Sequence, residues 1–186
     1  KVALIEKENS IAETVRTSGV TWIESIKEFG IPDNCYNPIK NFSFVSPNNE
    51  VTISDSIATA AVLDVRKTYR WLANEAEETG ADIFLKININ EVIKNENNDI
   101  VGVKGTGPKG EIIFHSKIVI DATGFTSVIS KAMGFVTQWK RFGAGAEYEA
   151  IVENSDPDTW WLMVGQEYTP AGYAWIFPLG NNIVRI

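Results

Sequence analysis

The stretch IVIDATGFTSVISKAMG, residues 118–134, decides the fold of this 186-residue chain. An apolar run, predicted to be a strand, brings Asp121 to a tight turn that ends at Gly124, and a short predicted helix follows. Without a large side chain at the turn, a diphosphate or a ribose could approach the backbone. Ser127 is placed to cap the helix, whose free amides suit an anion. An ordinary strand–turn–helix joint explains the same spacing, so both interpretations stay open at this point.

The run VALIE at residues 2–6 is apolar and ends in a carboxylate. Such a run predicts a short strand buried on both faces of a parallel sheet. In a βαβ dinucleotide-binding unit, the second strand ends in an acid that accepts hydrogen bonds from ribose hydroxyls. Glu6 is a candidate for that acid, although a solvated carboxylate at a strand end is the commoner situation.

A literal G-x-G-x-x-G pattern occurs at Gly105, Gly107 and Gly110, within GVKGTGPKGEIIF. The pattern binds a dinucleotide only between a strand and a helix, where the diphosphate meets the helix amides. Here strand-like residues lie on both sides, and Pro108 favours a turn. The sequence therefore predicts a β-hairpin without a role in cofactor binding.

Helical and β-type segments follow one another in an order typical of an α/β fold. DVRKTYRWLANEAEETG at 64–80 predicts a helix, with Asp64 as its N-cap and Gly80 at its C-terminal end. The segments 41–46 and 51–54 predict a second hairpin, and the chain is β-rich from residue 142 onward. The order indicates an α/β unit that is interrupted by a separate sheet.

Composition excludes several classes of function. The net charge is −7 and no basic run exists, which argues against nucleic-acid binding. One cysteine, Cys35, excludes an internal disulfide framework, and one histidine, His115, gives a zinc site little support. No apolar run approaches the roughly 18–20 residues of a membrane span. Both ends of the chain fall within β-like runs, so we expect a segment of a longer protein.

The stretch GYAWIFPLGNN at residues 172–182 carries large aromatic residues in alternation. Tyr173, Trp175 and Phe177 are therefore predicted to share one face of a strand that Pro178 ends. Three aromatic rings on one face could line an apolar pocket. They could equally form the core of a sheet, and the spacing alone does not decide between the two.

Five stretches in this order resemble the geranylgeranyl reductase family of FAD-dependent enzymes. These stretches are VALIEKE, TVR at 14–16, VLDVRKTYRWLANEAEETGADI, IVIDATG and PAGYAWIFPLGNN. The family includes digeranylgeranylglycerophospholipid reductases and is related to FixC-like quinone reductases and, more distantly, to flavin hydroxylases. The D-A-T-G turn is shared across that superfamily, whereas the Y-x-W-x-F-P strand is narrower and decides the assignment.

The resemblance implies a Rossmann-like FAD-binding domain of the glutathione-reductase/hydroxylase type, interleaved with a β-rich substrate domain, both incomplete. Residues 1–35 and 62–138 would form the FAD-binding part, and residues 36–61 and 139–186 the substrate-binding part. The family's own glycine loop would precede Lys1, and a later cofactor-contacting turn would follow Ile186. The 186 residues alone are therefore expected to bind FAD weakly and to be inactive.

The resemblance also assigns the cofactor contacts. Glu6 resembles the acid that holds the adenosine ribose, and Arg16 resembles an arginine near the FAD diphosphate. Ile89 matches a position that meets adenine through its backbone. Asp121 and Gly124 match the second turn that contacts the cofactor.

On the substrate side, Tyr173, Trp175 and Phe177 match the strand that lines the isoprenoid cavity beside the flavin. Many members carry a cysteine after the arginine, whereas Thr17 stands there in this chain. This departure puts a step assisted by cysteine in doubt. No residue is assigned as the catalytic acid, and no metal is expected.

The implied activity is the reduction of prenyl double bonds in a lipid or pigment precursor, in the cytoplasm and peripherally at the membrane. The implied partners are an isoprenoid lipid and an electron donor, which would be a ferredoxin, NAD(P)H or another flavoprotein. A flavin monooxygenase, halogenase or quinone reductase on the same scaffold is an alternative. A module that binds a hydrophobic ligand without redox chemistry is another.

Overall fold

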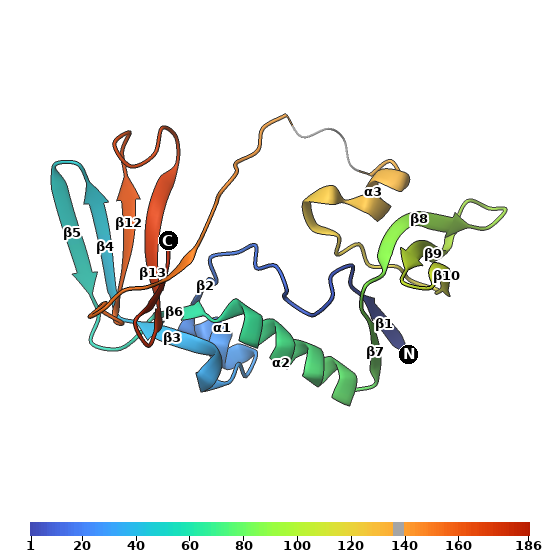
Figure 1. Cartoon of the computed structure of the whole chain (residues 1–186), viewed down its shortest axis with the longest axis horizontal. Coiled ribbons are helices and arrows are strands. Elements are labelled where there is room, and N and C mark those ends of the chain that lie inside the picture. The colour runs from blue at the N-terminus through green and yellow to red at the C-terminus, as the bar shows by residue number, and fades with distance from the viewer. Residues whose placement is uncertain (136–139) are drawn as a thin grey trace. The chain divides into compact units, whose positions relative to one another are not determined.

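The computed structural model describes residues 1–135 and 140–186, which form two compact units. The first unit comprises Lys1–Thr14 and Leu72–Ala144, and the second comprises Val15–Trp71 and Gly145–Ile186. Helix α2 (Val65–Glu78) runs along the chain from the second unit into the first (Figure 1).

The first unit contains five strands, one 3₁₀ helix and one short α-helix in its described residues. These are β1 (Val2–Ile5), β7 (Ala81–Phe84), β8 (Asn88–Lys94), β9 (Ile100–Gly107), β10 (Gly110–His115), η2 (Gly124–Thr126) and α3 (Val128–Ala132).

The second unit is dominated by strands. Its elements are β2 (Val20–Trp22), α1 (Ile23–Glu28), η1 (Asp33–Cys35), β3 (Tyr36–Ile39), β4 (Asn41–Ser46), β5 (Asn49–Ser54), β6 (Ala60–Leu63), β11 (Glu149–Ile151), β12 (Thr159–Val164), β13 (Tyr173–Gly180) and β14 (Ile183–Arg185).

Strand β1 pairs in parallel with β7, from Val2 opposite Ala81 to Ile5 opposite Phe84. This confirms the predicted parallel strand. The expectation that both faces are buried is wrong in this structure, because Val2 is 66% and Leu4 is 38% exposed. The reason is that residues 1–5 line an open cleft, and β1 has a strand on one edge only within residues 1–135 and 140–186.

The G-x-G-x-x-G stretch forms the predicted hairpin, with Gly107 of β9 opposite Gly110 of β10. Gly105 lies close to the neighbouring strand β8. A Cβ built on it would lie 2.5 Å from the carbonyl oxygen of Asn88. Gly110 has a φ of +106°, which suits glycine at the turn. These glycines are therefore explained by the packing of a three-stranded sheet in the order β10-β9-β8.

Two sheets build the second unit. The smaller has the order β2-β6-β3 and is antiparallel, and the larger has the order β11-β14-β13-β12-β4-β5. Within the larger sheet β4 and β12 pair in parallel, although more than 100 residues separate them in the sequence (Figure 1). The predicted hairpin of β4 and β5 is confirmed, with Ser46 opposite Asn49.

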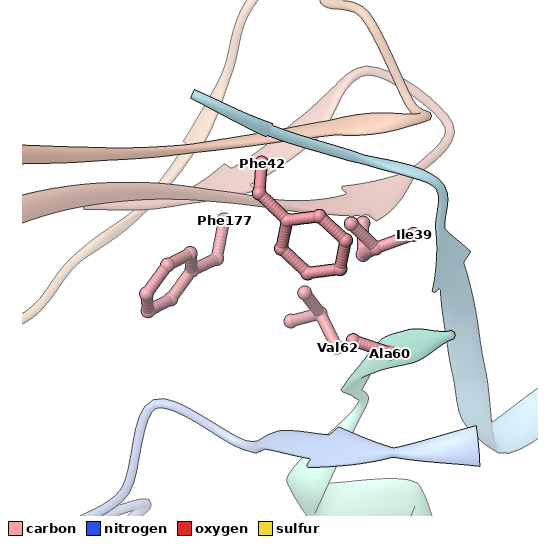
Figure 2. Packing of buried hydrophobic residues seen from close by; sticks show 5 residues of the cluster. All are labelled: Ile39, Phe42, Ala60, Val62 and Phe177. Carbon is pink, nitrogen blue, oxygen red and sulfur yellow. The ribbon is translucent and has the colours of Figure 1, made fainter. Parts of the chain in front are cut away.

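The core of the second unit joins these two sheets. It consists of Ile39, Phe42, Ala60, Val62 and Phe177, which are all less than 10% exposed (Figure 2). Figure 2 shows the rings of Phe42 and Phe177 above Val62 and Ala60. Burial of aliphatic and aromatic side chains of this size is worth about 1.5–3 kcal/mol each. The site residues on β13 are thus carried by a well-packed sheet.

Helix α2 begins and ends as its sequence predicts. The Asp64 carboxylate accepts a hydrogen bond from the amide of Lys67 at 3.1 Å, which is an N-cap contact. At the other end Gly80 has a φ of +95° and follows the last helical turn.

The expected division into an FAD-binding part and a substrate-binding part remains a prediction, because compact units need not coincide with ligand-binding domains. Residues 15–35 and 62–71, expected in the FAD-binding part, belong to the second unit. The physical reason is strand pairing, since β2 and β3 flank β6 in one sheet. The expected boundary between residues 138 and 139 lies outside the described residues.

Candidate cofactor and ligand site

The segment after β1 is a turn held together by carboxylate–amide hydrogen bonds. The Glu6 carboxylate accepts from the amide of Glu8 at 2.9 Å, and that of Glu8 accepts from the amide of Thr14 at 2.9 Å. Glu13 accepts from the amide of Asn9 at 2.7 Å. Glu6 is half-buried, so it is neither a core residue nor a freely solvated side chain.

The backbone joins this turn to the segment that leads into β8. The amide of Ile87 donates to the carbonyl of Glu6 at 3.0 Å, and the amide of Lys86 donates to the carbonyl of Glu8 at 3.0 Å. Two of the predicted cofactor residues, Glu6 and Ile89, therefore lie in segments that are tied to one another. An open pocket of about 580 Å³ lies there, lined by Lys7, Glu8, Asn9, Glu13, Thr14 and Asn88.

A larger apolar cleft of about 970 Å³ lies beside β1. It is lined by Lys1–Ile5, by Ile89 and by most of segment 113–122, together with Val103 and Ile129. The predicted strand at 118–120 is not formed, and Ile118 and Ile120 are 80% and 84% exposed. Within the described residues this segment has no strand to pair with. Glu6 and Asp121 thus follow two segments that line the same cleft.

Asp121 is the most heavily bonded side chain of the predicted site. Its Oδ1 accepts from the amide and the hydroxyl of Thr123, at 3.1 and 2.6 Å. Its Oδ2 accepts from the amide and the hydroxyl of Ser130, at 2.8 and 2.6 Å. The carboxylate therefore fixes the turn and the start of α3, and its acceptor capacity is used within the chain.

Burial would raise the pKa of the Asp121 carboxyl, but hydrogen bonds from Ser130 and Thr123 outweigh it and hold the pKa well below its ordinary value. The carboxylate is consequently ionised throughout the physiological range.

The cap of α3 differs from the predicted one. Ser127 makes no side-chain cap bond, and its hydroxyl donates instead to the carbonyl of Gly124 at 3.2 Å. The amide of Val128 donates to the hydroxyl oxygen of Thr123 at 2.8 Å. The prediction that the Ser127 side chain caps α3 is wrong, because the backbone of Ser127 is left-handed, with a φ of 47°. Thr123 and Ser130 are the residues that the sequence reasoning missed.

Gly124 is exposed and has a φ of +65°. No described atom lies within 4 Å of a Cβ built on it. Its backbone is therefore open to a ligand, as the sequence interpretation requires.

Arg16 lies in the second unit, in an exposed segment without helix or strand. The Thr17 hydroxyl oxygen accepts from the amide of Gly19 at 3.4 Å. Thr17, which stands where many relatives are expected to have a cysteine, thus has a local role in the turn.

The aromatic residues of β13 form a row on one face, as predicted. The ring centroids of Tyr173 and Trp175 lie 5.9 Å apart, and those of Trp175 and Phe177 lie 6.1 Å apart and are stacked. Exposure rises along the row from 4% at Phe177 to 54% at Tyr173. The row therefore leads from the core to the surface. Pro178 does not end β13, which continues through a register shift to Gly180.

Two aromatic residues outside β13 extend this row. Trp160 of β12 packs on Phe177 at 5.2 Å and on Phe42 at 5.1 Å. The indole nitrogens of Trp160 and Trp175 are buried and have no hydrogen-bond partner in the described part of the chain. Because a buried donor without an acceptor costs about 1–3 kcal/mol, an oxygen atom from water or a ligand would be favourable at each.

Comparison with known proteins shows which family the chain is similar to. Residues 143–186 match the model described as the geranylgeranyl reductase catalytic domain, and these residues include β11 to β14. The digeranylgeranylglycerophospholipid reductase of Methanocaldococcus jannaschii is 33% identical over 98% of this chain. The chain is similar to the geranylgeranyl reductase family over nearly its whole length.

The chain spans about half the length of the curated relatives it matches, for example 47% of the M. jannaschii protein. A geranylgeranyl bacteriochlorophyll reductase-like protein from Thermoplasma acidophilum superposes on the whole chain with a TM-score of 0.83 and 26% identity, over 49% of its own length. The myxobacterial chondrochloren halogenase, an FAD-dependent halogenase, superposes on the whole chain with a TM-score of 0.70, over 46% of its own length. Its identity is 16%, so it shares the fold alone.

No helix within residues 1–135 and 140–186 combines the length and the apolar character that crossing a bilayer requires.

Proposed function

We propose that the protein containing this chain is an FAD-dependent oxidoreductase that reduces prenyl double bonds in geranylgeranyl chains of a lipid. The observation that carries the proposal is the aromatic row of Tyr173, Trp175 and Phe177, which lies within the residues that match the family's catalytic domain. Relatives of this chain are named for reducing a digeranylgeranylglycerophospholipid, which gives the class of substrate.

The residues of the first unit fit the adenosine part of FAD. The polar pocket beside Glu6 offers carboxylate and amide groups to ribose hydroxyls, and Asn88 lines it, while Ile89 lines the neighbouring apolar cleft. The open backbone at Gly124 suits the close approach of a phosphate or a ribose. Because the Asp121 carboxylate is already fully hydrogen-bonded, its proposed role is to hold this turn in place. By resemblance, Arg16 is the proposed contact of the diphosphate.

We propose that the finer fold of the first unit is a Rossmann-like sheet, in which the apolar cleft beside β1 takes a further parallel strand. The free edge of β1 and the exposed Ile118 and Ile120 line this cleft. The relatives are about twice as long as this chain and could supply such a strand. Parallel sheets are normally covered on both faces, which the apolar run of β1 would require.

When bound, reduced FAD supplies a hydride for one carbon of a prenyl double bond, while a proton reaches the other carbon. An isolated alkene has no carbonyl that hydrogen bonds could polarise. The chain's own residues therefore act by position and by exclusion of water. The graded row from Phe177 to Tyr173 offers apolar ring faces to a branched hydrocarbon, whose burial is worth about 0.8 kcal/mol per CH₂.

The proposed electron donor is a reduced ferredoxin, NAD(P)H or another flavoprotein. Because the proposed substrate is a lipid, the protein is proposed to act in the cytoplasm, in peripheral contact with a membrane surface.

Two measurements on the full-length protein test the proposal. After purification and FAD reconstitution, the absorbance spectrum should show a bound flavin, and its absence would leave only a hydrophobic-ligand module. The dithionite-reduced protein should then add two hydrogens per double bond to a geranylgeranyl lipid, as read by mass spectrometry. An added oxygen or halogen would instead identify a monooxygenase or halogenase on the same fold.

A further inference from the structure

Arg185 at the end of β14 is a buried cation. It is 1% exposed, although arginine is almost never fully buried without partners. Its Nη2 donates to Glu149 Oε1 at 2.6 Å, and its Nη1 donates to the carbonyl oxygens of Ser18 at 2.8 Å and Leu63 at 3.3 Å. The guanidinium therefore joins β14 and β11 to the turn that follows Arg16.

That turn is held from several sides. The carbonyl of Gly19 accepts from the amide of Leu63 at 2.8 Å. Gly19 has a φ of +75°, and a Cβ built on it would lie 2.8 Å from Val65 Cγ2 and 2.9 Å from the Leu63 carbonyl oxygen. The same Cβ would lie 3.0 Å from Arg185 Nη1. The backbone can take this course only with glycine at this position, and Arg185 packs directly against it.

We propose that Arg185 is a positioning residue for cofactor binding, which acts by fixing the backbone from which Arg16 projects. The ligand group concerned is the diphosphate of the dinucleotide, and the inference rests on the proposed function. A long arginine side chain loses much conformational freedom when it binds an anion. An anchored backbone lowers that cost, because less of the chain must be ordered on binding.

The chemistry of the contact explains why arginine stands at this position. The planar guanidinium donates to two carbonyls and a carboxylate at once, whereas an ammonium group cannot present donors in that fork geometry. Glu149 lies beside the guanidinium and balances its charge.

The test is a double-mutant cycle in the full-length protein, with FAD affinity and melting temperature measured for each variant. Arg16→Met should weaken FAD binding about tenfold, in line with the loss of one charge-assisted contact. Arg185→Met should weaken it by a similar factor. The double variant should bind FAD no more weakly than Arg16→Met alone, because both changes remove the same contact. Arg70→Met, at an exposed position on α2, is the matched control and should leave the affinity unchanged.

Arg185→Lys covers the case in which Arg185→Met does not fold. It keeps a positive charge beside Glu149 but cannot reach all three acceptors, so it should be less destabilised than Arg185→Met, while FAD affinity falls by a similar factor. Additive losses in the cycle, or an affinity that follows only the melting temperature, would overturn the proposal. Unchanged affinity in Arg16→Met would overturn it too. The flavin spectrum and lipid reduction of that variant would then still report on the proposed function separately.

Discussion

Strands β6 and β1 have nearly the same composition but opposite surroundings. In β6 (Ala-Ala-Val-Leu) the first three residues are 0% exposed, since β2 and β3 pair with both edges and Ala60 and Val62 pack in the core with Phe42 and Phe177. In β1 (Val-Ala-Leu-Ile) Val2 is 66% exposed, and β7 is the one neighbour within the described residues. An apolar run therefore indicates that a strand is suited to burial, and the strands beside it together with the side chains over its faces decide whether burial occurs.

The largest effect is expected from Val62→Asp in β6. An unpaired carboxylate in this core should cost more than about 4 kcal/mol and unfold the second unit. Urea unfolding followed by tryptophan fluorescence measures it, because Trp160 packs against this core. The matched control is Val51→Asp on β5, where the side chain is 59% exposed. Equal losses in the two variants would refute the placement of β6 in the core.

The next largest effect sharpens the comparison. In the full-length protein Val2→Asp should cost about 2–4 kcal/mol, because a further strand is proposed to close the cleft over β1. Differential scanning calorimetry of the full-length protein measures it, again beside Val51→Asp. If the two variants behave alike, the cleft remains open to water and the proposed Rossmann-like sheet is wrong.

Asp121→Asn should destabilise the turn before α3 by about 2 kcal/mol, since an amide cannot accept at both ends. Hydrogen exchange at the amides of Val128 and Ser130 should accelerate, because both donate to the network. Asp82→Asn removes an exposed ion pair with Lys1 and should change little. Unchanged exchange at both amides in Asp121→Asn would contradict the observed network.

The smallest effect is a dependence on pH. The folded pKa of Asp121 is lowered, so its contribution to stability is present above its unfolded value and is lost as the pH falls toward the folded value. The difference in melting temperature between wild type and Asp121→Asn should therefore shrink below about pH 4. A difference that stays constant from pH 6 to pH 3 would show that ionisation of Asp121 is not involved.

Local features of the fold could be predicted from the sequence because neighbouring residues determine them. The cap at Asp64 and the hairpin at Gly107 and Gly110 are of this kind. The strand at 118–120 was not observed, because pairing depends on a partner strand that the described residues do not provide.

The candidate site was predictable in part. The shared face of Tyr173, Trp175 and Phe177 follows from alternation and is confirmed. Trp160 was missed. It is adjacent to Trp161, and this adjacency shows only that the two side chains point to opposite faces of a strand. Arg185 was missed because its partners lie 36, 122 and 167 residues away in the sequence. The cofactor roles of Glu6, Arg16, Ile89, Asp121 and Gly124 remain predictions.

The most direct test of the account compares FAD with FMN, which lacks the adenosine half. Dissociation constants of both are measured for the full-length protein and for Glu6→Ala, with Glu77→Ala on the exposed face of α2 as control. If Glu6 holds the adenosine ribose, Glu6→Ala should weaken FAD binding about tenfold, as for a lost charge-assisted hydrogen bond, and leave FMN binding unchanged. Equal losses for the two flavins, or no loss for FAD, would contradict the assignment of the first unit to adenine-dinucleotide binding.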